Sequence, residues 1–157
     1  MAVASRSVSS IETVSTIDGF EALAGEWDDL VRAMPRPSPF LLHGWLAEWW
    51  RHYGQRAEFA VQVAHVDGHL AGALPVVVRR RAGVRVASFM GGRTSVLPDV
   101  LLAPDADPEL VQQLLGRLSS GGCDVADFHG LSAGSRIAAQ AKLGRRDNQL
   151  DVLRQLQ

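Results

Sequence analysis

The sequence predicts a mixed α/β fold with a central, largely antiparallel sheet flanked by helices. Three observations indicate this class. Two amphipathic helical segments precede the main run of strands, an Asp67-Gly68 pair joins two strongly apolar strands, and the chain then finishes as helix, strand and helix. Because helices and strands alternate in this order, neither an all-helical bundle nor a sandwich of two sheets fits.

Length, composition and charge exclude several classes of protein. A chain of 157 residues corresponds to about one domain. With 46% hydrophobic and 21% charged residues it is typical of globular proteins, and a net charge of -1 gives no overall attraction to nucleic acid or anionic lipid. The single cysteine, Cys123, excludes an internal disulfide and a cysteine-rich zinc site, so no metal is expected. No apolar run suits a signal peptide or a membrane span, and we expect a cytoplasmic protein.

The first third of the chain predicts one strand and two helices. After a disordered terminus over 1–9, alternation predicts a strand over 11–17, and Asp18 is expected to cap a helix that continues to Met34. Pro35, Pro37 and Pro39 end that helix. The second helix is expected over 43–53, with Gly54 at its C-terminal end.

The Asp67-Gly68 turn predicts a hairpin of strands 59–66 and 69–79. If Val66 lies opposite His69, one face of the hairpin is aliphatic and the other is small or polar. The aliphatic face would hold Val61, Val63, Leu70, Leu74, Val76 and Val78. The hairpin is therefore expected to be half-buried, with a shallow second face.

The rest of the chain predicts alternating elements. Strands are expected over 84–90, 99–103 and 124–129, and helices from Asp107 to Leu118 and over 135–143. A single domain would then span 10–143. The remaining segment, 144–157, is expected to be a polar tail or a truncated interdomain segment.

Two groups of side chains are candidates for ligand binding. Trp45, Trp49 and Trp50 form either an aromatic wall along a substrate groove or the packed face of a buried helix. Arginines are concentrated near the second hairpin, where Arg80, Arg81 and Arg85 would bind an anionic cofactor or simply form a solvated hairpin tip.

A third group offers acid–base chemistry. Asp127 and His129, two residues apart on the last strand, would share a face and form an acid–base pair, with Asp99 approaching from a neighbouring strand. The same residue types are also common where a sheet meets water. Ser132 lies in a Gly-x-Ser-x-Gly motif between a strand and a helix, but no histidine follows it to serve as a base. A serine esterase is therefore a distant alternative.

Several strings of this sequence together resemble a known family. They are Trp27-Asp28-Asp29-Leu30, the segment from Ser38 to Trp50, the segment from Asp67 to Pro75, and Pro98-Asp99-Val100-Leu101-Leu102-Ala103-Pro104. Over residues 10–135 the chain resembles the CelD-type acetyltransferases associated with cellulose and exopolysaccharide synthesis. That family belongs to the GNAT superfamily and is similar to the Fem-type aminoacyl transferases.

The resemblance implies a function and a division of labour. It implies that an amine of a polysaccharide or cell-envelope substrate attacks the thioester of acetyl-CoA, in a protein made of two GNAT-like halves. This chain resembles the first half.

The superfamily's diphosphate loop, Gln/Arg-x-x-Gly-x-Gly/Ala, has no match in this sequence. The nearest string, from Arg80 to Arg85, leads into a predicted strand instead of a helix. We therefore expect a supporting, substrate-binding half that pairs with a second half or with another copy, and no catalytic residue is carried over from the family. The alternative is a non-catalytic binding module.

Overall fold

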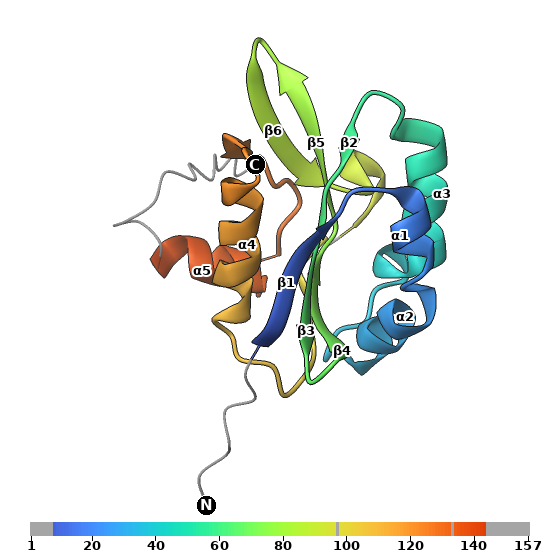
Figure 1. Ribbon diagram of the computed structural model, residues 1–157, viewed down its shortest axis with the longest axis vertical. Helices are drawn as coiled ribbons and strands as arrows, with labels where there is room; N and C mark the ends of the chain where they lie inside the picture. Colours follow the sequence, from blue (N-terminus) through green and yellow to red (C-terminus); the bar gives the residue numbers. More distant parts are fainter. Residues whose placement is uncertain (1–7, 97, 133, 144–157) are drawn as a thin grey trace, which may run out of the picture.

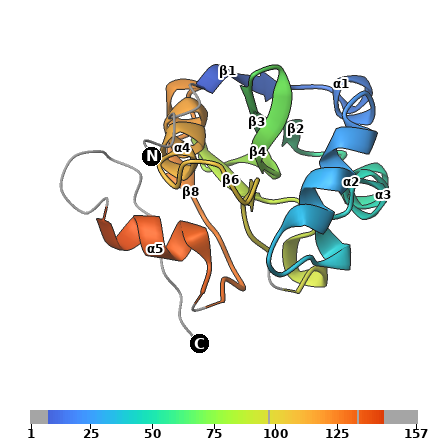
Figure 2. The ribbon, with the colours of Figure 1, turned by 90° about the horizontal axis from the view of Figure 1, so that it is seen from below.

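The computed structural model describes residues 8–96, 98–132 and 134–143, and in it two four-stranded sheets lie between two layers of helices. Helices α1 (Ile17–Glu21), α2 (Ala24–Ala33) and α3 (His43–Tyr53) cover one face, and α4 (Leu110–Ser120) and α5 (Arg136–Leu143) cover the other (Figures 1 and 2). This arrangement confirms the predicted fold class.

The first sheet has the order β1-β3-β4-β7, and every neighbouring pair in it is antiparallel. Its strands are β1 (Val8–Val14), β3 (Val61–Val66), β4 (His69–Leu74) and β7 (Leu101–Leu102). Strand β1 begins two residues inside the segment that was expected to be a disordered terminus; residues 1–7 lie outside the described residues.

The second sheet has the order β2-β5-β6-β8 and mixes two directions. Strands β2 (Glu58–Phe59), β5 (Val76–Arg81) and β6 (Val84–Phe89) pair antiparallel, whereas β8 (Val125–Ala126) pairs parallel to β6. Beyond the residues paired with β2 and β8, the β5–β6 hairpin projects from the body of the molecule (Figure 1).

Pro75 marks the passage from one sheet to the other. The sequence predicted one strand over 69–79, but the structure divides it into β4 and β5, and Pro75 lies between them. Because proline has no backbone N–H, it cannot donate within a ladder, and strands commonly break or change sheets there. The Pro75 carbonyl still accepts a hydrogen bond from the Met90 N–H at 2.9 Å, which extends the β5–β6 pairing by one position beyond Val76 and Phe89.

The predicted register of the first hairpin is confirmed for its first two pairs, but the register beyond them and the predicted faces are wrong. Val66 pairs with His69 as expected, whereas a bulge follows because His65 pairs with Leu70 and Ala64 with Gly72. The extra residue, Ala71, reverses the alternation of side chains. As a result the expected aliphatic face is divided between the two layers.

Both faces of the hairpin are covered, and each contributes to a separate hydrophobic cluster. The cluster beneath α1, α2 and α3 includes Val61, Val63, Leu70, Phe20, Trp27 and Leu46. The cluster beneath α4 and α5 includes Leu74, Val76, Val78, Leu110, Leu114 and Ile137. Strands buried on both faces are near-continuous in apolar residues, and the small side chains of Ala64 and Ala73 belong to the buried core instead of a shallow surface.

The N-terminal helix differs from its prediction in two ways. It is divided into α1 and α2, and Leu23 joins them. The Leu23 N–H donates to the Phe20 carbonyl, and the Leu23 carbonyl accepts from the Trp27 N–H. Its cap is Thr16, whose hydroxyl accepts a hydrogen bond from the Gly19 N–H at 3.1 Å, so the expectation that Asp18 is the cap was wrong. Threonine supplies the acceptor from the position before the first turn, while Asp18 lies inside that turn.

Candidate functional site

The strongest candidate site lies in the segments that follow β8 and precede β7. The chain leaves β8 after Ala126, and Phe128 then packs against Phe89 with ring centroids 4.5 Å apart. Asp127 stays attached to β6 because its N–H donates to the Ala87 carbonyl at 2.8 Å. The side chains of Asp127 and His129 are thereby presented at the C-terminal end of the strand.

Asp127 and His129 are in contact, as the sequence predicted. The Nε2 of His129 lies 3.0 Å from Oδ1 of Asp127, and the histidine side chain is 42% exposed. A carboxylate bonded to one ring nitrogen fixes the orientation of an imidazole and leaves the other nitrogen for a proton exchanged with a ligand. The geometry suits an acid–base pair, and a role for it in a reaction stays a prediction.

Asp99 makes a different set of contacts. One oxygen of its carboxylate accepts a hydrogen bond from the Ser135 hydroxyl at 3.0 Å, and the other accepts from the Arg136 N–H at 3.4 Å. Asp99 therefore caps α5, and no contact joins it to Asp127 or His129 within the described ranges. Burial raises the pKa of this carboxyl, although its hydrogen bonds to Val100, Ser135 and Arg136 act in the opposite direction.

The three tryptophans proposed to line a groove have different environments. Trp49 is buried and lies beneath the Arg79 guanidinium, whose carbon is 5.8 Å from the ring centroid. Trp50 is half-buried and meets Phe59 edge-on at 4.8 Å. Trp45 is 40% exposed, so of the three it alone offers a substantial free surface to a ligand.

Two neighbours hold Trp45 in place. Its indole N–H donates to the Ser95 hydroxyl at 3.1 Å, and its ring meets Phe40 edge-on at 5.2 Å. The turn that carries Ser95 begins at Gly91, where φ is 94° and a Cβ would collide with the Ser95 side chain, so only glycine fits. The indole is thus rigid, and its polar atom is already satisfied.

The arginine cluster is partly neutralised by the chain itself. Arg85 donates to the Glu58 carboxylate at 2.5 Å and to the carbonyls of Gly121 and Gly122. Arg79 stacks on Trp49 and donates to the Tyr53 carbonyl. Arg80 and Arg81 remain exposed on the projecting hairpin, directly before its Ala82-Gly83 turn.

Neither α4, which follows β7, nor α5, which follows β8, offers a diphosphate its N-terminus. Between β7 and α4 the chain carries Pro104 and Pro108, which have no N–H, and three carboxylates at positions 105, 107 and 109. The Asp107 carboxylate accepts a hydrogen bond from the Glu109 N–H at 2.9 Å. At α5, Asp99 occupies the corresponding place. Because a diphosphate needs free N–H groups at a helix N-terminus, the residues present do not fit the diphosphate of acetyl-CoA at either helix.

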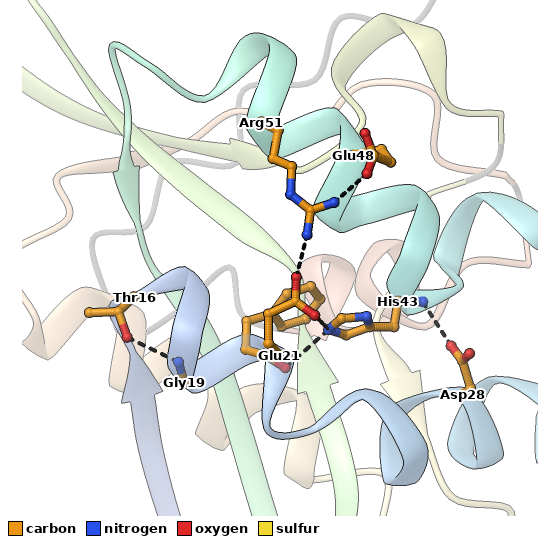
Figure 3. Close-up of polar contacts among 8 residues, drawn as sticks. Thr16, Gly19, Glu21, Asp28, His43, Glu48 and Arg51 are labelled. Carbon is orange, nitrogen blue, oxygen red and sulfur yellow. Dashed lines mark hydrogen bonds and ion pairs between the residues drawn. The ribbon is translucent and has the colours of Figure 1, made fainter.

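Sequence reasoning missed a polar network that joins the three N-terminal helices (Figure 3). His43 is buried, stacks on Phe20 at 4.2 Å, and places Nε2 3.1 Å from the Phe20 carbonyl oxygen. Glu21 lies 3.8 Å from the same nitrogen and pairs with Arg51 at 2.7 Å. Asp28 accepts from the His43 N–H at 2.8 Å. Each side chain has a partner within the chain, so the network holds α1, α2 and α3 together.

The Gly-x-Ser-x-Gly segment lies between β8 and α5, directly after Asp127 and His129 in the sequence. Ser132 is half-buried in the loop before α5, and its carbonyl accepts the Ser135 N–H at 3.0 Å. No hydrogen bond joins its hydroxyl to His129 in the part of the chain that the structure describes.

Among the described residues, no group of three or more His, Cys, Asp or Glu side chains is arranged to hold a metal ion. None of the helices described there is long and apolar enough to cross a membrane.

Comparison with known proteins gives the fold a name. No family model and no curated protein matches this chain, but solved structures do. A ribosomal-protein-alanine N-acetyltransferase from Brucella melitensis biovar Abortus 2308 superposes with a TM-score of 0.52 at 14% identity, over 96% of this chain and 100% of that one. The chain has a GNAT-type acetyltransferase fold.

Two further solved structures agree. An aminoglycoside acetyltransferase from an uncultured soil metagenomic sample, solved in complex with sisomicin, superposes with a TM-score of 0.50 at 13% identity over 94% of each chain. A possible acetyltransferase from Clostridium difficile 630 superposes with a TM-score of 0.51 at 6% identity, over 94% of this chain and 96% of that one. At these identities the likeness is one of fold.

Proposed function

We propose that this chain is a GNAT-like domain of an acyltransferase that transfers an acyl group from acetyl-CoA to an amine of a polysaccharide or cell-envelope substrate. Within that protein it acts as the supporting, substrate-binding half. A second GNAT-like half, or another copy of the chain, supplies the site for the cofactor. The protein acts in the cytoplasm, where acetyl-CoA is made.

One observation carries this proposal. The chain has an acetyltransferase fold throughout, yet the turn that leads from β7 into α4 is acidic and contains two prolines. The fold favours acyl transfer as the activity of the whole protein, and the turn favours a second domain as the place where the diphosphate binds.

The substrate side of the proposal depends on Trp45 and on the Asp127–His129 pair. A rigid, exposed indole offers an apolar face to a sugar ring, and its own N–H does not compete for the ligand because Ser95 already accepts from it. His129, oriented by Asp127, is the group available to take a proton from an ammonium substrate.

Calorimetry with acetyl-CoA tests the division of labour. We expect no heat of binding to the chain alone at cofactor concentrations up to about 1 mM, which corresponds to a binding free energy weaker than about -4 kcal/mol. The variant Arg80→Ala/Arg81→Ala serves as the control for weak, nonspecific attraction of the anion to the hairpin tip. Micromolar binding to the chain alone that persists in this variant would overturn the proposal.

A non-catalytic binding module is the second candidate, favoured by the exposure of Trp45. Titration with chitosan oligosaccharides, followed by tryptophan fluorescence, separates the readings by chemistry. Saturable binding that is lost in Trp45→Ala supports an amine-bearing glycan substrate. Binding without acetyl transfer to any amine, by any preparation of the protein, favours the module. The distant alternative, a serine esterase, would lose ester hydrolysis in the variant Ser132→Ala. We expect this substitution to leave any ester hydrolysis unchanged.

A further inference from the structure

The exposed apolar side chains of the protein gather along α3 and the segments that pack against it. Among the residues that the structure describes, the exposed large apolar or aromatic side chains are Trp45, Tyr53, Val84 and Val96. Trp45 and Tyr53 belong to α3, and Val96 directly follows Ser95, which accepts the Trp45 indole N–H. Val84 begins β6 of the projecting hairpin. Exposed apolar groups that gather in this way, unlike single scattered ones, are typical of a binding surface.

Arg79 joins α3 to the β5–β6 hairpin. Its guanidinium carbon lies 5.8 Å from the centroid of the Trp49 ring, and its Nη2 donates to the Tyr53 carbonyl at 3.1 Å. Arg81 lies two residues further along β5 and therefore on the same face as Arg79, and Val84 pairs with Arg81 across the hairpin. These residues form one continuous surface, the α3 strip, defined by Trp45, Trp49, Tyr53, Arg79, Arg81 and Val84.

The hairpin end of the α3 strip is positively charged. No aspartate or glutamate occurs over residues 68–98, which include both strands of the hairpin. Within the described ranges no ion pair involves Arg79 or Arg81, and Glu58 is engaged by Arg85 on the opposite face of the hairpin. Burial, and then repulsion from Arg81, lower the pKa of Arg79. Anionic groups placed along this end would therefore be attracted to both guanidinium groups.

The α3 strip is too long for a small ligand. An α-helix rises about 1.5 Å per residue, so Trp45 and Tyr53 lie about 12 Å apart along the axis of α3. The hairpin continues the strip past Tyr53, because it projects from the body of the molecule (Figure 1). A linear chain that carries both ring faces and repeated anionic groups matches this length and this sequence of side chains.

The position of His129 gives the strip a direction. Strand β8 pairs parallel to β6, so the chain runs from Ala126 toward the Phe89 end of β6, where Phe128 packs on Phe89. His129 follows at that end, whereas Arg81 and Val84 lie at the opposite end of the hairpin, next to its turn. A cationic amine near His129 would therefore lie away from the two arginines.

We propose that the α3 strip binds a linear, anionic polysaccharide as the acceptor chain. Sugar rings of the chain stack on Trp45 and Tyr53, its anionic groups pair with Arg79 and Arg81, and its amine faces His129. This inference rests on the proposed function, because it names the class of acceptor that the Trp45 surface takes. Single-stranded nucleic acid also combines rings with negative charges, but domains that bind it are typically strongly basic, and this chain has a net charge of -1.

Calorimetric titration of the whole chain with hexagalacturonate and with its methyl ester tests the proposal. The two probes have the same rings, linkages and length, and they differ in charge. We expect saturable binding of the acid, and binding of the ester that is weaker by about ten-fold, as for the loss of two partly exposed ion pairs. Chitosan oligosaccharides and a single-stranded oligothymidylate of equal length are titrated in parallel.

Two pairs of variants locate the contact. Arg81→Gln is expected to weaken hexagalacturonate about two- to five-fold, whereas Arg80→Gln, which removes the same charge from the other face of the hairpin, should change its affinity by less than about two-fold. Tyr53→Ala should weaken binding several-fold, and Tyr53→Phe, which keeps the ring, should not. Because Arg81 and Tyr53 are exposed, these variants are expected to fold, and circular dichroism checks this.

The outcomes separate this inference from the proposed function. Equal binding of the acid and its ester, equal effects of the two arginine variants, or tighter binding of the oligothymidylate would overturn the inference alone. Binding of chitosan oligosaccharides without binding of hexagalacturonate would do the same and would leave the proposed function in place. Absence of binding by every one of these glycans would contradict both.

Discussion

Asp99 joins two segments that lie 36 residues apart in the sequence. Its carboxylate receives hydrogen bonds from the Ser135 hydroxyl and the Arg136 N–H, and Ser135 in turn accepts from the Ala138 N–H at 3.4 Å. Since α5 has only eight residues, it depends on such tertiary contacts for its stability. The residue that the sequence suggested as an acid for chemistry therefore has a clear structural role.

Substitution of Asp99 separates the charge from the hydrogen bonds. We expect Asp99→Ala to lower the free energy of unfolding by about 1–3 kcal/mol near neutral pH, because it leaves the buried Ser135 hydroxyl and the Arg136 N–H without an acceptor. Asp99→Asn keeps an acceptor oxygen and should cost less. Urea denaturation of the three proteins measures both differences.

The pH dependence follows from the direction of the shift. Burial raises the pKa of Asp99 in the folded state above its ordinary value of 3.8, which applies to the unfolded state. Between 3.8 and the raised pKa, the folded state therefore binds more protons than the unfolded state. Stability therefore falls as the pH rises through this window, and it is recovered as the pH falls again. The wild-type chain should lose stability relative to Asp99→Asn over that interval. A difference that stays constant with pH would show that the carboxylate is not destabilised by burial.

At the scale of elements, α3 shows how one helix combines packing with an exposed surface. Leu46, Ala47 and Trp49 are buried against the sheets, while Trp45 emerges beside the turn that begins at Gly91. Because 45 and 49 are four residues apart, they lie on one side of the helix, and the shape of the neighbouring turn decides which of them is covered. The sequence pattern alone does not contain that information.

The two tryptophans should therefore respond differently to truncation. We expect Trp49→Ala to cost about 3–5 kcal/mol of unfolding free energy, as for other buried aromatic residues, and Trp45→Ala to cost about 1 kcal/mol or less. Acrylamide quenching provides a second readout: the readily quenched part of the fluorescence should disappear in Trp45→Phe. Similar costs for both alanine variants would mean that Trp45 is a packing residue and not a free surface.

Local signals predicted most of the elements and only some of their relations. The Asp67-Gly68 turn set the hairpin and its first pair, and Gly54 ends α3 as expected. The bulge at Ala71 and the passage between sheets at Pro75 were not predicted, because each depends on where the neighbouring strands and helices lie. The contact between Asp127 and His129 was predicted because two residues apart on an extended chain share a face, whereas the Asp99–Ser135 contact joins distant segments.

At the scale of the whole molecule, the two hydrophobic clusters share their central strands. Val76 and Val78 of β5 belong to the cluster under α4, while Val77 between them belongs to the cluster under α3. A strand that contributes alternate residues to both layers couples them, since loss of one layer exposes the same backbone that supports the other. We therefore expect the two layers to unfold together.

The position of the tryptophans makes this coupling testable. All four tryptophans lie in α2 and α3, so their fluorescence reports on one layer, whereas far-ultraviolet circular dichroism reports on the whole chain. Leu114→Ala is a change in the opposite layer, under α4, where Leu114 is fully buried. We expect it to lower the free energy of unfolding by about 2–5 kcal/mol in both signals, with coincident transitions.

The matched variants are Leu46→Ala and Gly116→Ala. Leu46 is equally buried in the other layer, and its truncation should give the same coincident loss. Gly116 lies on the exposed side of α4, where an added Cβ meets no atom within 4 Å, and alanine there should stabilise the chain by up to about 1 kcal/mol. If Leu114→Ala shifts the circular dichroism transition and leaves the fluorescence transition unchanged, the two layers unfold separately, and the shared strands do not couple them.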